Sequence, residues 1–395
     1  MSAADLIVVG AGTMGAWTAL HARRSGRSTL LLDAYGAGHP RATSGGETRI
    51  IRSAHGDDRF YTRWSRAARE AWMALEAQTG ETLFRQCGAL WFSHRDNGFE
   101  AASARTLRAE GIPVEALSVG EVAARWPRVR VDDLSGALFE PEAGLLMARR
   151  GVMTVARRFA EEGGTFELAA VHPGRVDGRR LLEVVDGDGR AWAAGAFVFA
   201  AGPWLPRLFP AELGDVIRVT KQDVLFFGPA GGDRDWEAGA IPCWVDYDRA
   251  FYGIPATDGR GFKLAPDRYG PVWDPSHGER LVDPESVRLV REYLAERFPA
   301  LARQPVVESR VCQYETTPDT HFLIDRHPDL DNVWLVGGGS GHGFKHGPEI
   351  GRHVVARLDG APPPEDDRFS LSRPRRREAG VRTGGDGMVT AWEGY

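Results

Sequence analysis

Three glycines and one aspartate near the amino terminus have the types and spacing to bind a dinucleotide. The glycines form the pattern Gly10-x-Gly12-x-x-Gly15, and Asp33 follows 23 positions after the first of them. The first glycine permits a tight turn, the second lets a pyrophosphate approach the backbone, and the third lets a helix pack against a strand. A carboxylate at the end of the next strand accepts hydrogen bonds from ribose hydroxyls. The segment therefore predicts a bound nucleotide cofactor.

Lysine is so rare in this chain that each one is a candidate for a special role. Only three of the 49 basic residues are lysines, namely Lys221, Lys263 and Lys345. Arginine has replaced lysine wherever any cation would serve. A remaining lysine can therefore mark a place that needs a compact charge or a shifted pKa. The alternative is that each lysine is an ordinary surface residue, kept by chance and without a special role.

The elements around the glycine pattern form a βαβ unit. Residues 6–9 predict a strand, residues 16–24 a helix and residues 28–32 a second strand. A strand, a glycine-rich turn and a helix return at residues 332–357. An NAD-dependent domain would instead continue through further βαβ crossovers to about residue 150. The arrangement favours FAD over NAD, a choice that the glycine pattern alone does not make.

We predict an α/β fold in which a Rossmann-like FAD-binding domain is interleaved with an α+β substrate domain built on an antiparallel sheet. Residues 1–84, 146–218 and 306–365 are assigned to the FAD-binding domain, and residues 85–145 and 219–305 to the substrate domain. Residues 371–395 lack periodicity and predict a flexible tail, in which Arg373 and its neighbouring arginines are solvated.

The composition argues against several classes of partner. A net charge of −5 gives no reason to expect nucleic acid or an anionic membrane. No stretch approaches the roughly 18 apolar residues of a membrane span, and residues 1–5 lack the basic segment of a signal peptide. The odd number of cysteines, without paired spacing, argues against a disulfide framework and for a reducing cytoplasm. No cysteine and histidine cluster has zinc spacing, so no metal is expected.

Motifs in the second half of the chain resemble a known family. The run Val311-Cys312-Gln313-Tyr314-Glu315-Thr316-Thr317-Pro318-Asp319 precedes the run Gly339-Ser340-Gly341-His342-Gly343-Phe344-Lys345. With residues 48–52 and 200–204, these segments closely resemble the monomeric sarcosine oxidase family. That family includes N-methyltryptophan oxidase and belongs to the wider D-amino-acid oxidase-like flavoproteins. The resemblance covers about residues 5–370.

The resemblance implies FAD, attached through a thioether between Cys312 and the 8α-methyl group of the flavin. A thiolate can attack this electron-poor methyl group, and the cofactor then cannot dissociate. A small buried core residue is the alternative for Cys312. Amides around Gly341 could stabilise negative charge on the reduced flavin. The implied cofactor-binding residues are Gly10, Gly12, Thr13, Met14, Gly15, Asp33, Ala34, Ser44, Thr48, Arg49, Ala201, Gly202, Trp204, Cys312, Gly339, Gly341, His342, Gly343, Phe344 and Lys345.

The resemblance also implies roles for several cations. Arg52 and Lys345 match two residues that bind the substrate carboxylate, and charge-assisted bonds from both would fix the orientation of the substrate. Lys263 matches the lysine that activates dioxygen beside the flavin, because a fixed cation favours the formation of superoxide. Arg49 is expected beside the flavin ring. Lys221 matches no catalytic position and is treated as structural.

Two tyrosines and one aspartate complete the expected site. Tyr252 and Tyr314 match residues that line the substrate cavity, although each could instead be a core aromatic residue. Asp267 departs from the family pattern, because sarcosine oxidases have a substrate-contacting histidine four residues after the lysine. The departure puts sarcosine itself in doubt. A carboxylate here could favour an amine with extra positive charge, or could be neutralised by Arg268. The candidate catalytic residues are Lys263, Arg49, Tyr252 and Asp267.

The sequence thus predicts an FAD-dependent amine oxidase acting on a secondary or cyclic amino acid. The C–N bond would be oxidised to an imine while dioxygen is reduced to hydrogen peroxide, so the expected partners are an amino acid and dioxygen. The resemblance also suggests a monomer. One alternative is a dehydrogenase of the same fold that uses another electron acceptor. A less favoured one is an NAD(P)-dependent oxidoreductase or a non-catalytic nucleotide-binding protein.

Overall fold

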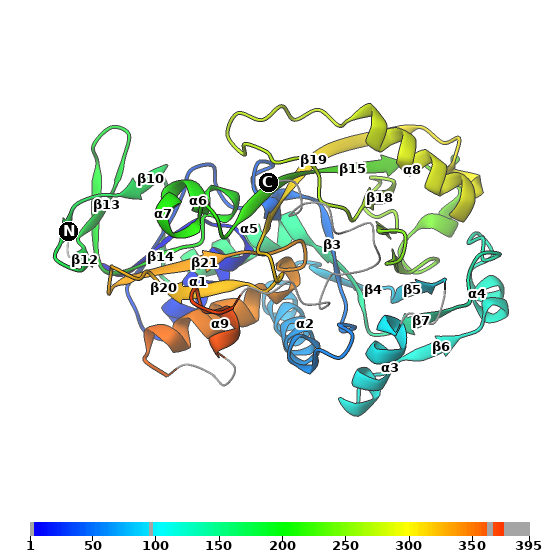
Figure 1. Ribbon diagram of the computed structural model, residues 1–395, viewed down its shortest axis with the longest axis horizontal. Coiled ribbons are helices and arrows are strands. Elements are labelled where there is room, and N and C mark those ends of the chain that lie inside the picture. The colour runs from blue at the N-terminus through cyan, green and yellow to red at the C-terminus, as the bar shows by residue number, and fades with distance from the viewer. Residues whose placement is uncertain (1–3, 95–97, 362–365, 375–395) are drawn as a thin grey trace.

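The computed structural model describes residues 4–94, 98–361 and 366–374, which form two lobes around two eight-stranded sheets (Figure 1). In the first sheet, five strands run parallel in the order β9 (Thr165–Leu168), β2 (Thr29–Asp33), β1 (Ala4–Val9), β14 (Ala191–Phe199) and β21 (Val333–Gly337). Antiparallel strands extend it: β20 (Leu323–Arg326) on β21, then β13 (Glu183–Asp186) on β14, and β10 (Val171–Pro173) on β13. Parallel strands of this kind carry apolar residues on both faces, as β1 and β2 do.

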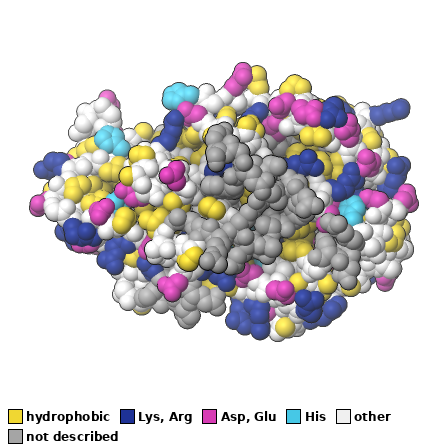
Figure 2. Space-filling model, in the orientation of Figure 1, with side chains coloured by type: hydrophobic (Ala, Val, Ile, Leu, Met, Phe, Trp, Pro, Cys, Tyr) yellow, Lys and Arg dark blue, Asp and Glu magenta, His cyan; other side chains and the backbone are white. Residues whose placement is uncertain are grey.

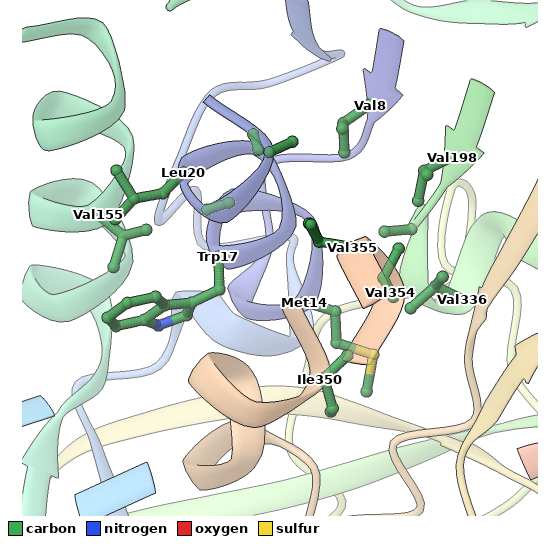
Figure 3. Packing of buried hydrophobic residues seen from close by; sticks show 14 of the residues in the cluster. Val8, Met14, Trp17, Leu20, Val155, Val198, Val336, Ile350, Val354 and Val355 are labelled. Carbon is green, nitrogen blue, oxygen red and sulfur yellow. The ribbon is translucent and has the colours of Figure 1, made fainter. Parts of the chain in front are cut away.

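Alternating residues of β1 pack against helices on opposite faces of the first sheet. Leu6 and Val8 join a core with α1 (Thr13–Arg24), α2 (Arg59–Thr79), α5 (Ala148–Glu161) and α9 (Gly347–Leu358) (Figure 3). Ile7 and Val9 join a second core with the short helices α6 (Leu205–Leu208) and α7 (Pro210–Leu213). Since successive side chains of a strand point to opposite faces, one apolar run supplies both cores.

Helices α1 and α9 approach closely because glycine stands at their contact. A Cβ atom on Gly351 would lie 2.6 Å from the backbone carbon of Trp17, closer than atoms can approach. The indole of Trp17 in turn meets Trp72 of α2 edge to face, with ring centroids 5.1 Å apart. This packing fixes the amino-terminal end of α1, which the glycine pattern places next to the predicted cofactor.

The second sheet is antiparallel except for one pair of strands. Its order is β19 (Val306–Thr316), β15 (Arg218–Phe227), β18 (Phe262–Pro266), β17 (Phe251–Ile254), β16 (Cys243–Asp246), β5 (Ala89–Ser93), β7 (Gly136–Glu140) and β6 (Glu115–Leu117). Only β16 and β5 pair in parallel among these neighbours. Helix α8 (Pro284–Arg297) lies over this lobe and packs Val290, Tyr293 and Leu294 into its core (Figure 1).

The remaining elements connect or decorate the two lobes. A three-stranded sheet joins them, formed by β3 (Thr48–Ile51), β8 (Gly144–Met147) and β4 (Phe84–Gln86). Helices α3 (Phe99–Ala109) and α4 (Val119–Arg125) flank the second sheet, and a small hairpin of β11 (Val176–Asp177) and β12 (Arg180–Leu181) extends from the first lobe. Strand β3 carries the segment that the sequence places beside the cofactor.

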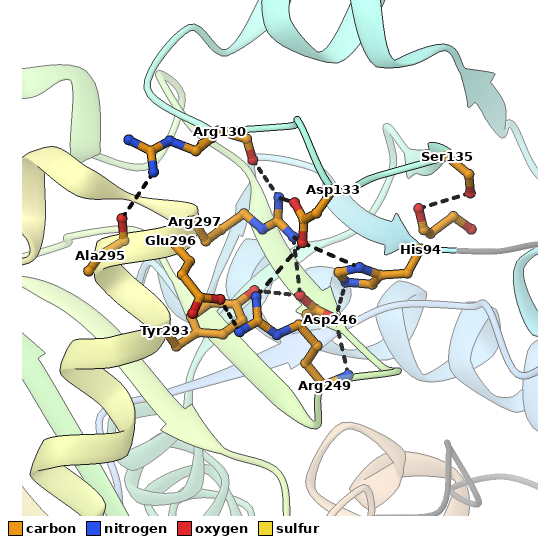
Figure 4. Close-up of polar contacts among 11 residues, drawn as sticks. His94, Arg130, Asp133, Ser135, Asp246, Arg249, Tyr293, Ala295, Glu296 and Arg297 are labelled. Carbon is orange, nitrogen blue, oxygen red and sulfur yellow. Dashed lines mark hydrogen bonds and ion pairs between the residues drawn. The ribbon is translucent and has the colours of Figure 1, made fainter.

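A buried polar cluster attaches α8 to β16 (Figure 4). Asp246 is inaccessible to solvent and accepts a hydrogen bond of 2.8 Å from the hydroxyl of Tyr293. The ring of His94 lies 2.9 Å from the same carboxylate, and Arg297 pairs with Asp133 at 2.8 Å. Buried charges are stable only when they are paired and hydrogen-bonded, so these residues hold the helix in one register on the sheet.

The observed architecture confirms the predicted fold class, while the domain boundaries stay a prediction. Strand β19 lies in the range assigned to the FAD-binding domain, yet it pairs along its length with β15, which opens the predicted substrate domain. The prediction that Arg373 is solvated is wrong. Its guanidinium forms a buried ion pair with Asp319 at 2.7 Å. Asp319 lies 54 positions away in the sequence, so no local pattern indicates this pair. The rest of the predicted tail, residues 375–395, lies outside the described residues.

Acidic and basic side chains are interspersed around the rim of the face drawn in Figure 2. Such mixing agrees with the modest net charge of −5. Within the described part of the chain, no helix combines the length and apolar character that crossing a bilayer requires.

Candidate active site

The glycine pattern forms a tight turn between β1 and α1. Gly10 has φ of 106°, and a Cβ atom there would lie 2.4 Å from the carbonyl oxygen of Ala200. A Cβ atom on Gly15 would lie 1.8 Å from the carbonyl oxygen of Gly10. Both positions therefore require glycine, one for backbone conformation and one for the contact between helix and strand.

Asp33 fixes this turn from the end of β2. Its Oδ2 accepts a hydrogen bond of 2.7 Å from the amide of Ala11, and its Oδ1 accepts from the amides of Tyr35 and Gly36. The hydroxyl of Ser44 accepts a hydrogen bond of 3.0 Å from the amide of Thr13, the first residue of α1. The amino-terminal end of α1 is thus presented to the adjacent cavity, as a pyrophosphate site requires.

A cavity of about 450 Å³ runs along this turn to the second sheet. Three of the predicted site residues do not line it, namely Gly15, Thr48 and Lys263. The predicted residues that do line it are Gly10, Gly12, Thr13, Met14, Asp33, Ala34, Ser44, Arg49, Arg52, Ala201, Gly202, Trp204, Tyr252, Asp267, Cys312, Tyr314, Gly339, Gly341, His342, Gly343, Phe344 and Lys345. These residues come from seven separate stretches of the chain, which therefore meet at one cavity.

The loop after β21 brings Gly339–Lys345 to this cavity. Gly341 has φ of 72°, and the amides of His342 and Gly343 both donate to the carbonyl of Gly339. The carbonyl of Phe344 accepts a hydrogen bond of 3.2 Å from the hydroxyl of Thr13. This bond ties the loop to the glycine turn, although the two are more than 300 residues apart.

Arg52 and Lys345 bring two buried positive charges to the same cavity. The Arg52 guanidinium lies over the indole of Trp91 at 5.1 Å, and the Lys345 ammonium donates to the carbonyl of His342 at 3.1 Å. Burial, with the charges of Arg52 and Lys345 acting in the same direction, keeps the pKa of His55 well below its ordinary value. The positive charge at this end of the cavity therefore comes from the two cations.

A carboxylate that sequence reasoning missed supports Arg52. Glu140 is buried and accepts hydrogen bonds from the amides of Ser53 and Ala54, at 2.7 and 3.1 Å, and from the indole of Trp91, at 2.8 Å. Burial raises the pKa of Glu140, while these three donors and the charge of Arg52 oppose the rise. No motif marked Glu140 or Trp91, because they reach the site from β7 and β5.

Lys263 faces a second, smaller cavity behind the first. This cavity measures about 30 Å³, room for a molecule the size of water. Arg49 and Cys312 line both cavities and separate them. The ammonium of Lys263 donates to the carbonyl of Thr48 at 3.0 Å, and burial together with the charge of Arg49 lowers its pKa to about 7.

Cys312 lies beside a guanidinium at the junction of the two cavities. Its Sγ accepts a hydrogen bond of 3.5 Å from the guanidinium of Arg49. The prediction that Cys312 and Arg49 belong to one site is thus matched by their placement, while their roles stay predictions.

Asp267 and the two tyrosines close the other wall of the cavity. The hydroxyl of Tyr314 donates to Asp267 at 3.2 Å, and the carboxylate is almost completely buried. The ring of Tyr252 lies 5.5 Å from the ammonium of Lys263. A negative charge therefore shares the cavity with the positive charges of Arg52 and Lys345.

Glu315 was quoted in the predicted motif without a role, yet it lines the cavity. One oxygen accepts from the amide of Gly339 at 3.4 Å, and the other lacks a hydrogen-bond donor among the described residues. Burial raises the pKa of this carboxyl to about 8. In its protonated form, which burial favours, Glu315 can itself donate a hydrogen bond into the cavity.

The structure also groups three buried histidines that have no metal-binding spacing in the sequence. The ligand atoms of His55, His342 and His346 lie within 4.8 Å of one another. Burial, together with the charges of Lys345 and Arg52, lowers the pKa of His346, and the same two charges would oppose a further cation. We therefore do not assign a metal to this cluster.

Comparison with known families agrees with this geometry. A family model described as FAD dependent oxidoreductase matches residues 5–357. The chain belongs to this family. The FAD-dependent oxidoreductase is 30% identical to monomeric sarcosine oxidase of Bacillus sp. (strain B-0618), over 96% of this chain and 98% of that protein. It is 28% identical to N-methyl-L-tryptophan oxidase of Yersinia pestis (strain Pestoides F), over 93% of this chain and 99% of that protein. The predicted family resemblance is confirmed.

A solved structure shares the fold at lower sequence identity. L-proline dehydrogenase from P. horikoshii superposes with a TM-score of 0.81 at 19% identity, covering 93% of this chain and 97% of that one. The residues of the large cavity fit the cofactor of an FAD-dependent oxidoreductase. The Gly10 turn leaves no room for a side chain, and the Asp33 carboxylate lines the cavity beside this turn.

Proposed function

We propose that this FAD-dependent oxidoreductase oxidises the C–N bond of a secondary or cyclic amino acid and passes the electrons to dioxygen. The observation that carries the proposal is the position of Lys263, a buried ammonium next to the cavity that Cys312 and Arg49 line. A fixed positive charge at that place would stabilise the superoxide that forms first when dioxygen is reduced.

Arg52 and Lys345 would bind the carboxylate of the substrate. Two cations that converge on one carboxylate also fix which face of the substrate meets the cofactor. Asp267 adds a negative charge on the same cavity. This charge favours substrates that carry a positive group besides the reacting amine, so the preferred substrate differs from sarcosine.

The cofactor would be held by the Gly10 turn, Asp33 and the Gly339–Lys345 loop, with Cys312 as its covalent attachment. Bound FAD supplies an acceptor for the two electrons that leave the substrate, which becomes an imine. Arg49 supports the attachment, because its guanidinium contacts the Cys312 sulfur where the two cavities meet. Glu315 can donate its proton to an acceptor atom in the cavity.

The visible absorbance of the purified protein, before and after acid precipitation, tests the cofactor. A yellow pellet below a colourless supernatant is expected for a flavin joined to Cys312. Cys312→Ser should move the colour to the supernatant, and Cys87→Ser is the matched control that should not. Colour released from the unaltered protein would contradict the covalent bond and leave the family assignment intact.

A screen of N-methyl and cyclic amino acids tests the reaction. Peroxide release that requires the amino acid is the expected result, with faster turnover for substrates carrying an additional cation. A protein that reduces a dye with these substrates but releases negligible peroxide would be a dehydrogenase of the same fold.

The name of the Bacillus relative also supports a monomer. The odd number of cysteines, without disulfide spacing, favours the cytoplasm. Light scattering after gel filtration tests the oligomeric state.

A further inference from the structure

Two cysteines outside the candidate active site lie next to each other. The Sγ atoms of Cys87 and Cys243 are 3.7 Å apart, although the residues are 156 positions apart in the chain. Cys87 follows β4 and Cys243 opens β16. The amide of Cys243 donates to the carbonyl of Gly88 at 3.1 Å, so the backbones are already held together. No sequence pattern indicates this pair, because its spacing matches no disulfide framework.

The two thiols differ in environment. Cys87 is partly accessible to solvent, whereas Cys243 is buried. A hydrogen bond from the Cys243 thiol lowers the pKa of Cys87, while burial raises the pKa of Cys243. Thiol pairs that react with peroxide combine an accessible thiolate with a neighbouring thiol that resolves the first product. Cys87 is the more accessible of the two thiols, and Cys243 is the adjacent thiol that could resolve its product.

The pair also lies close to the lysine that we place at the site of oxygen reduction. Strands β16 and β17 pair Trp244 with Gly253, which sets Cys243 opposite Ile254. Ile254 pairs in turn with Lys263 on β18. Residues opposite one another in a sheet share a face, and two strand spacings amount to about 10 Å. Peroxide released beside Lys263 would therefore form within a short diffusion path of the thiols.

We propose that Cys87 and Cys243 are a peroxide-reactive dithiol that closes to a disulfide. During turnover the peroxide would come from the oxidase function proposed above, and this part of the proposal rests on that function. The reactivity itself requires only the pair and peroxide.

The chemistry balances with peroxide as the oxidant. The Cys87 thiolate attacks one oxygen of hydrogen peroxide, the O–O bond breaks, and the departing hydroxide takes up a proton and leaves as water. The Cys243 thiol then loses its proton and attacks the Cys87 sulfenic sulfur, so that the S–S bond forms and a second water leaves. Two thiols lose two electrons, and one peroxide becomes two waters.

Closure demands little movement of the backbone. The sulfur atoms must approach from 3.7 Å to about 2 Å, the length of a disulfide bond. The pairing of β5 and β16 at Ala89 and Cys243 already holds the two backbones together. Side-chain rotation can therefore supply part of the approach of the sulfur atoms. The bond would link the turn before β5 covalently to β16.

Thiol alkylation and peptide mapping of the flavin-loaded protein test the proposal. The protein is treated with hydrogen peroxide, alkylated under denaturing conditions and digested without reductant. We expect a cross-linked peptide containing Cys87 and Cys243, the loss of two alkylatable thiols, and full recovery of both after reduction. Cys243→Ser should leave a sulfenic acid on Cys87 that a dimedone probe captures, and Cys87→Ser should abolish both products.

A second arm separates this proposal from the oxidase function. The same mapping is done during turnover with an amino acid that the screen identifies, with and without catalase. Cross-linking by added peroxide but not by turnover would uphold the dithiol and count against peroxide release at Lys263. The proposal is overturned if both thiols stay alkylatable after peroxide treatment, or if Cys87 is over-oxidised without a cross-link. The unaltered protein decides this, even if a variant fails to fold.

Discussion

The indole of Trp91 donates a hydrogen bond of 2.8 Å to the buried carboxylate of Glu140. The face of the same indole supports the guanidinium of Arg52, and Glu140 also accepts from the two amides that follow Arg52. The pair therefore fixes both the side chain and the backbone of a residue proposed to bind the substrate carboxylate. Positions of charges in a binding site depend on such supporting contacts as much as on the charged residue itself.

Replacing Glu140 should weaken the binding of carboxylate ligands without loss of flavin. In Glu140→Gln, one oxygen remains for three N–H donors, and the new amide meets the indole donor-to-donor. We expect the Kd for acetate, followed by the change in flavin absorbance, to rise about tenfold. Glu142→Gln is the matched control, because Glu142 pairs with Arg69 away from the cavity. Equal affinity in both variants would contradict a positioning role for Glu140.

Replacing Lys263 should slow the reaction with dioxygen selectively. Lys263→Met removes the charge but keeps the length of the side chain. We expect reoxidation by dioxygen, measured by stopped flow, to fall at least about a hundredfold, while anaerobic reduction by substrate changes much less. Lys221→Met is the control, since Lys221 lines neither cavity. An unchanged reoxidation rate would refute the role of Lys263.

The same reaction should depend on pH through Lys263. Burial lowers the pKa of this ammonium to about 7, so the charge is present below that pH and is lost above it. Reoxidation by dioxygen should therefore slow as the pH rises through the pKa of Lys263, and Lys263→Met should lack this dependence. A negatively charged reduced flavin nearby would move the midpoint upward without changing its direction. A rate that rises with pH in the unaltered protein would contradict this assignment.

Neutralising Asp267 should change substrate preference. Asp267→Asn keeps an acceptor for the hydroxyl of Tyr314 and removes the negative charge. We expect the preference for N-methyl-lysine over N-methyl-leucine, measured as the ratio of kcat/KM values, to fall roughly tenfold. Tyr314→Phe removes the hydrogen bond and keeps the charge, so its ratio should change less. A preference that survives in Asp267→Asn would place the specificity elsewhere.

The cluster around Asp246 should make stability depend on pH through His94. The hydrogen bond to Asp246 raises the pKa of His94 above its ordinary value. The stabilising contribution is therefore complete below about pH 6.5 and is lost as the pH rises through the higher folded-state pKa. His94→Gln should lower the free energy of unfolding in urea more at pH 6 than at pH 8. His277→Gln serves as control and should show a smaller difference, because solvent screens the exposed pair of His277 with Asp274.

The sequence predicted the elements whose signals are local, and missed contacts made between distant strands. The Gly10 turn, α1 and β2 follow from residues within one short segment, and the structure has them there. Glu140 and Trp91 could not be assigned, because only the pairing of β5 with β7 brings them together. The Cys87 pair depends likewise on the parallel pairing of β5 with β16. Nothing local distinguishes these residues from ordinary core residues.

Strand β19 places limits on how this part of the chain can change in length. Cys312 and Tyr314 are two residues apart on a strand that pairs continuously with β15 from Arg218 to Phe226. Both side chains therefore point to one face of the strand. A single inserted or deleted residue between them would turn one of the two away from the cavity and shift every later pair. Substitutions can accumulate along β19, but the number of residues between Cys312 and Tyr314 cannot change without disrupting the site.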